Sequence, residues 1–89
     1  MRPRRPLSEL PNLGPKSQAA LAAAGITTVE QLRRLGSVAA YAKAKQAGAS
    51  TSLNLLWALE GALTGLPWQV VAREHRTSLL LALEQTRDA

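Results

Sequence analysis

Apolar residues recur along this chain at the spacing of helices, in short segments separated by glycine and proline. The pattern predicts one helical turn at residues 7–12, followed by longer helices at about residues 15–24, 28–36, 38–47, 52–64 and 68–86. No segment shows the alternating β-branched pattern of a strand, and alanine and leucine dominate the composition. We therefore predict an all-α fold, a compact bundle of five or six short helices.

Local signals place several helix ends. Residues 13–16 are expected to form a tight turn, and Pro15 within it suits the first position of a helix, where its missing N–H costs nothing. Gly25 is placed to end that helix in the left-handed conformation, with Ile26 folding back on it. Thr27 and Glu30 have the spacing of a capping box, which predicts that Thr27 caps the next helix. Ser37 is expected to cap the helix after that.

The segment at residues 52–64 is apolar nearly all round, so it is expected at the centre of the fold. Gly61 within it would let a neighbouring element approach closely, although glycine costs helix stability by about 1 kcal/mol. The last helix is expected to bend near residues 74–76, where polar residues cluster.

The apolar stripes of these segments define a candidate core. Trp57 and Trp68 are also candidates for stacking on bases or partners, but Trp57 lies in the most apolar segment and Trp68 is expected at the edge of the core. The expected core residues are Leu13, Leu21, Ile26, Val29, Leu32, Leu56, Trp57, Leu59, Leu63 and Trp68.

Charge is distributed unevenly along the 89 residues, whose formal net charge is +5. Residues 13–48 hold five lysines and arginines against one glutamate, a net charge of +4, which favours a polyanionic partner or simply a solvated surface. Residues 1–6, with three arginines and two prolines, are expected to form a disordered basic tail before one domain at residues 7–89. The apolar runs are much shorter than the roughly 20 residues of a membrane span, so we expect a soluble, cytoplasmic protein.

The turn before the second helix is the candidate binding site. The N-terminus of a helix presents free amides and a partial positive charge, which suits a phosphate. Here Lys16 adds a full charge and Ser17 a hydroxyl. We therefore predict a contact to the nucleic-acid backbone formed by Gly14, Pro15, Lys16 and Ser17, with Arg33 and Arg34 at a neighbouring phosphate. The alternative is that the turn merely joins two packed helices and that Lys16 is solvated.

Catalytic chemistry finds little support in the sequence. There is no cysteine and a single histidine, His75, so a zinc site would need several well-spaced carboxylates, which are lacking. Glu60 and Glu74 do not have the spacing of a catalytic pair, and no nucleotide-binding loop is present. We expect a protein that is not an enzyme and that uses no cofactor.

Several motifs together resemble the carboxy-terminal domain of the TfoX/Sxy family, bacterial regulators of competence for DNA uptake. They are LPNLGPKS at residues 10–17, AAGI at 23–26, VEQLR at 29–33, AAY at 39–41, SLNLLWALEGALTG at 52–65, and Trp68. The resemblance implies a regulatory role in DNA transformation. Members typically carry a further amino-terminal domain, whereas only a few residues precede Leu7 here, so the chain would be a stand-alone version or a fragment.

The first third also looks like the helix-hairpin-helix, a SAM-like motif, of the RNA polymerase α-subunit carboxy-terminal domain, which contacts promoter DNA and activators. DNA-binding hairpins of this type usually have glycine on both sides of the central residue of the turn. This chain has Gly14 but places Lys16 at the second position, which lowers the expected DNA affinity.

Two hypotheses follow. In the first, the domain binds DNA backbone weakly and without sequence preference through the hairpin. In the second, it binds a regulatory protein or a second copy of itself, through an apolar patch left free by the helix at residues 53–63.

Overall fold

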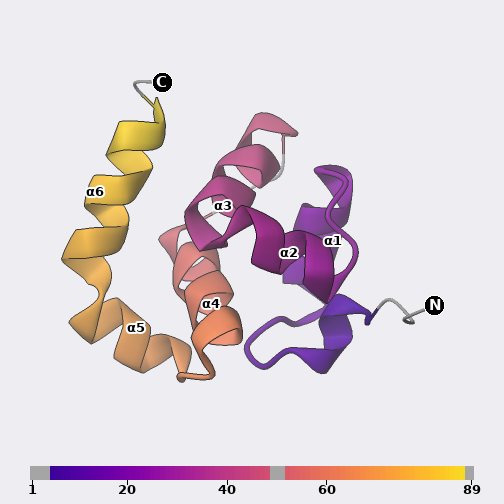
Figure 1. Ribbon diagram of the computed structural model, residues 1–89, viewed down its shortest axis with the longest axis horizontal. Helices are drawn as coiled ribbons and strands as arrows, with labels where there is room; N and C mark the ends of the chain where they lie inside the picture. Colours follow the sequence, from indigo (N-terminus) through magenta and orange to yellow (C-terminus); the bar gives the residue numbers. More distant parts are fainter. Residues whose placement is uncertain (1–4, 49–51, 88–89) are drawn as a thin grey trace.

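The computed structural model describes residues 5–48 and 52–87, and this part of the chain is built from helices (Figure 1). An all-α fold is therefore confirmed. The first helix of the expected hairpin motif is only a single 3-10 turn. The elements are η1 (Leu7–Glu9), α1 (Pro15–Ala23), α2 (Val29–Leu35), α3 (Ser37–Gln46), α4 (Leu53–Thr64), α5 (Trp68–Glu74) and α6 (Arg76–Arg87).

Helix α1 begins and ends where its sequence signals predict. Pro15 is its first residue, and Gly25 follows it with a φ of 81°. The amide of Gly25 donates to the carbonyl of Ala22 at 2.9 Å, and the amide of Ile26 donates to the carbonyl of Leu21 at 2.9 Å. These two bonds satisfy carbonyls that the helix end leaves free, and they fold buried Ile26 back onto the core.

The capping box of α2 lies one residue later than predicted. Thr28, not Thr27, is the N-cap: its hydroxyl accepts from the amide of Gln31 at 3.2 Å, and the Gln31 side chain accepts from the amide of Thr28 at 3.2 Å. Val29, the first residue of the helix, is fully buried, as expected. Glu30 therefore takes no part in the capping box.

Glu30 instead holds the start of the described chain. The amide of Arg5 donates to the Glu30 carboxylate at 3.2 Å, and the Arg5 guanidinium lies 3.7 Å from the same group. The amide of Val29 donates to the Arg5 carbonyl at 2.9 Å, and Pro6 forms an isolated bridge with Thr28. Arg5 and Pro6, expected in a disordered tail, are thus attached to the start of α2; the rest of that tail, residues 1–4, lies outside the described residues.

Ser37 does not cap α3 as predicted. Gly36, with a φ of 84°, precedes the helix, and Ser37 is its first residue. The Ser37 side chain is only 5% exposed and donates to the Glu60 carboxylate at 2.8 Å. Because its hydroxyl is used across the fold, Ser37 joins α3 to α4 rather than closing its own helix.

Helix α4 is the centre of the fold, as its sequence predicts. It packs against α3 and α5 and lies between α6 on one side and η1, α1 and α2 on the other (Figure 1). Seven of its residues are buried: Leu55, Leu56, Trp57, Ala58, Leu59, Gly61 and Ala62. The apolar patch expected to remain free on this helix is therefore covered by the domain itself, and Leu53, at its first position, is the exposed one among its large apolar side chains.

Among the expected core residues, two differ from the prediction. Leu63 is half-buried, and Trp68 is 40% exposed. Trp68 opens α5 directly after Pro67, where the helix has only begun to pack on α4, whereas Val71, one turn later, is fully buried. The others, namely Leu13, Leu21, Ile26, Val29, Leu32, Leu56, Trp57 and Leu59, are buried.

The last helical segment is broken at His75, within the predicted bend. His75 ends α5 with its amide bonded to the Val71 carbonyl, and its own carbonyl accepts from the amide of Leu79 in α6. Helix α6 packs against α3 and α5 along one side of the molecule (Figure 1). In the described part of the chain, no helix has both the length and the apolar character needed to cross a membrane.

Candidate nucleic-acid interface

The hairpin before α1 turns on Asn12, Leu13 and Gly14. Leu13 is buried, and Asn12 has a φ of 70°, in the left-handed region that non-glycine residues rarely adopt. The two residues that flank the centre of the turn are therefore Asn12 and Gly14. Lys16 was expected at the position of the second glycine of DNA-binding hairpins, but it already belongs to α1. That position is occupied by Asn12.

Asn12 fixes this hairpin to the connection between α4 and α5. Its side-chain amide donates to the carbonyl of Leu66 at 2.9 Å, in the connection between α4 and α5. Both groups lie over Gly61: a Cβ built there would stand 2.5 Å from the Leu66 oxygen and 2.6 Å from the Asn12 nitrogen. The close approach predicted for Gly61 is confirmed, and it holds the turn against α4.

The N-terminus of α1 is open toward solvent. Gly14 is its N-cap and supplies no side chain, while the amide of Gln18 donates to the Gly14 carbonyl at 3.0 Å. Lys16 and Ser17 lie in the first turn, where backbone amides have no acceptor within the helix. The Lys16 side chain is exposed, so an ammonium and two amides are presented at one helix end.

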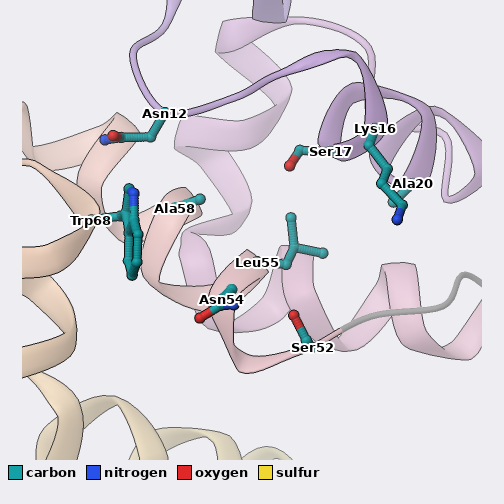
Figure 2. A pocket seen from close by; sticks show the side chains of 9 residues that line it. All are labelled: Asn12, Lys16, Ser17, Ala20, Ser52, Asn54, Leu55, Ala58 and Trp68. Carbon is teal, nitrogen blue, oxygen red and sulfur yellow. The ribbon is translucent and has the colours of Figure 1, made fainter.

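A groove of about 420 Å³ runs from this helix end to the start of α5. Figure 2 shows Lys16 at one end and Trp68 at the other, with Ser17, Leu55 and Ala58 between them. The groove combines polar side chains with an apolar floor. Its lining residues are Asn12, Lys16, Ser17, Ala20, Ser52, Asn54, Leu55, Ala58 and Trp68.

Arg34 lies away from this groove. It lines a smaller hollow of about 200 Å³, together with Gly25 and Lys43, at the C-terminal end of α1. At 1.5 Å of rise per residue, Lys16 and Ala24 are separated by about 12 Å along α1. Arg33 is exposed on the same turn of α2. Arg34, predicted at a phosphate next to the one at Lys16, thus lies near the other end of α1.

Two residues that line these hollows could not be found from the sequence pattern. Trp68 enters the groove because α5 starts at its rim, and Lys43 joins Arg34 because α3 packs beside α2. Both depend on contacts between distant elements, and local periodicity carries no signal for them.

Three of the described glutamates, each on a different helix, have polar or charged partners. Glu60 accepts from Ser37, Glu74 lies 3.9 Å from Arg73, and Glu30 is bonded to Arg5. The pKa of Glu30 is lowered from its ordinary value of 4.5, mainly by its own backbone amide and then by Arg5. Within residues 5–48 and 52–87, no group of three His, Asp or Glu side chains could hold a metal ion.

Comparison with known proteins agrees with the motifs of the sequence. Residues 3–83 match the family of the TfoX C-terminal domain. The chain is also similar to the DNA transformation protein TfoX of Haemophilus influenzae, with 34% identity over 79 residues. That match covers 89% of this chain and 36% of the relative, so the chain spans about a third of that protein. No solved structure matches the chain. The chain belongs to the TfoX C-terminal domain family.

Proposed function

We propose that this domain is a regulatory module in DNA transformation that binds the DNA backbone and catalyses no reaction. The name of the Haemophilus influenzae relative supports the process. This chain covers only about a third of that relative, so its own role in DNA transformation is part of the proposal.

The observation that carries DNA binding is the open N-terminus of α1. Lys16 and the free amides of Lys16 and Ser17 meet there, beside the turn at Gly14 and Pro15. Such a site holds a phosphate but has no means of reading base edges, so binding should be weak and independent of sequence.

Arg34, with Lys43, supports a second contact at the other end of α1. The distance of about 12 Å along the helix means that it would hold a different phosphate from the one at Lys16. Arg33, exposed beside it, adds positive charge to that end. The proposed interface therefore follows the length of α1.

The proposal is tested by fluorescence anisotropy of a labelled duplex across a range of salt concentrations. About three phosphate contacts should give a log–log slope of roughly −3. Lys16→Glu should weaken binding at low salt and reduce the slope by about 1. Lys45→Glu is the matched control, because Lys45 is exposed but lines neither hollow and should cost less.

A duplex that does not bind at low salt, or that binds equally to Lys16→Glu and Lys45→Glu, would overturn the proposal. The competing function is a protein-interaction module. Among the described large apolar side chains, Leu81 of α6 is the most exposed, at 56%, so a partner surface for that function would include α6 and not the covered face of α4. Sedimentation that shows a stable dimer indifferent to DNA would establish that function instead.

A further inference from the structure

The exposed indole of Trp68 is the starting observation. Trp57 is 4% exposed and packs in the core, whereas Trp68 is 40% exposed at the rim of the groove. Figure 2 shows the Trp68 ring nearly edge-on, with one face turned toward the groove. An open aromatic face can accept a flat ring by stacking.

The charges along the groove indicate which kind of ligand would carry such a flat ring. Lys16 lies at the end opposite Trp68, and none of the described residues that line the groove is acidic. Between them, Leu55 and Ala58 form a mostly buried apolar floor, and Asn54 offers an exposed amide. A ligand that matches this order has an aromatic ring at one end and an anion at the other.

We infer that the groove binds a single strand of DNA, with one base stacked on Trp68 and a flanking phosphate at Lys16. This inference rests on the proposed function and specifies its ligand. A base inside a duplex has both faces covered by its neighbours, whereas a base of an unpaired strand can offer a face to Trp68. The volume of about 420 Å³ is in the range of pockets that hold small organic ligands, a class to which a single nucleotide belongs.

The test compares a labelled thymine oligonucleotide of about 12 nucleotides with a duplex of equal length, again by anisotropy at low salt. Trp68→Ala should weaken binding of the single strand roughly tenfold and leave duplex binding unchanged, because stacking is lost and the phosphate contact remains. Trp68→Tyr keeps an aromatic face and should retain most of the affinity for the strand. Lys16→Glu should weaken the binding of both the single strand and the duplex.

Fluorescence provides a second readout that does not depend on Trp68→Ala folding normally. The single strand should quench the tryptophan emission of the unaltered protein, and the quenching should disappear in Trp68→Tyr, where only buried Trp57 emits. Equal binding of strand and duplex, with no effect of Trp68→Ala, would overturn the inference and leave the proposed function standing. If the unaltered protein binds neither the strand nor the duplex, both the inference and the proposed function are overturned. Displacement of the strand by thymidine monophosphate at the same concentration would overturn the assignment to a strand.

Discussion

At the scale of single residues, the contact among Asn12, Gly61 and Leu66 connects the hairpin to the centre of the fold. The Asn12 amide and the Leu66 carbonyl are bonded to each other directly above the Gly61 backbone. A left-handed Asn12 positions its side chain for this bond. The contact therefore holds the candidate interface in place through two polar groups and one missing Cβ.

Gly61→Ala should destabilise the protein although alanine is the better helix former. The gain in helix propensity is about 1 kcal/mol. The added Cβ would meet a backbone oxygen at 2.5 Å and a bonded side chain at 2.6 Å, and overpacking of this kind costs about 1–3 kcal/mol. Because one of the two close atoms belongs to the backbone, which cannot shift cheaply, we expect a cost in the upper part of that range, about 2–3 kcal/mol. The net loss is then about 1–2 kcal/mol, seen in thermal unfolding as a decrease in Tm of roughly 4–16 °C.

Gly14→Ala is the control for this substitution. Its Cβ would meet no atom within 4 Å, and the φ of Gly14 is −81°, which alanine adopts freely. The Tm should therefore change by only a few degrees. A Gly61→Ala variant as stable as the unaltered protein would show that α4 and the hairpin move apart without cost.

At the scale of elements, the start of α2 illustrates how one residue of register changes a cap. Thr27 and Thr28 each precede, by three residues, a side chain that can accept a hydrogen bond. The amides of both threonines donate to the side chain of Gln31. Only Thr28 receives the amide bond from Gln31. Val29, which directly follows this cap, is fully buried.

Thr28→Ala should cost more stability than Thr27→Ala. Loss of an N-cap hydroxyl typically lowers the free energy of unfolding by about 0.5–2 kcal/mol. The Thr27 hydroxyl makes one exposed bond of 3.3 Å to the Gln31 side chain, and that substitution should stay within about 0.5 kcal/mol. Urea unfolding of the two variants measures the difference directly. Equal losses, or a larger loss for Thr27→Ala, would favour the register that the sequence alone predicts.

At the scale of the whole molecule, burial decreases from α4 toward α6. Helix α4 contributes seven buried residues, whereas Leu79 is the buried residue among those described in α6. Leu81 faces solvent. Helix α6 is therefore held by fewer apolar contacts than the centre of the fold.

Hydrogen exchange of the native protein should reflect this gradient. Amides in α4 should exchange only with global unfolding, and those in the second half of α6 should exchange at least roughly tenfold faster through local opening. Two-dimensional NMR in deuterated buffer resolves the two sets once the rates are corrected for intrinsic exchange. Equal protection in both helices would contradict the expected gradient and would mean that α6 unfolds together with the core.

The sequence predicted the helices well because their ends depend on local chemistry. Pro15 starts α1, Gly25 ends it, and the uniformly apolar segment around Trp57 could be stable only in the interior. The break between α5 and α6 at His75 was visible as a cluster of polar residues. In each case, the residues that decide the structure are neighbours in the chain.

The candidate site was predicted only in part. The helix start at Lys16 and Ser17 was predicted because it is a local feature, and both residues lie in the first turn of α1. Their contact with a phosphate stays a prediction. Arg34 belongs to α2 and lies near the C-terminal end of α1, and Trp68 lies in the groove. Both positions depend on how helices pack on one another. Local spacing cannot specify either.

By itself, the sequence therefore determined the all-α class, the order of the helices and the identity of the central helix. Only the tertiary structure decided that Ser37 bonds to Glu60, that Asn12 bonds to Leu66 and that Trp68 stays partly in solvent. The physical reason is the range of the interactions. Helix formation and capping join residues within a few positions of each other, whereas these bonds and surfaces form between segments that folding alone brings together.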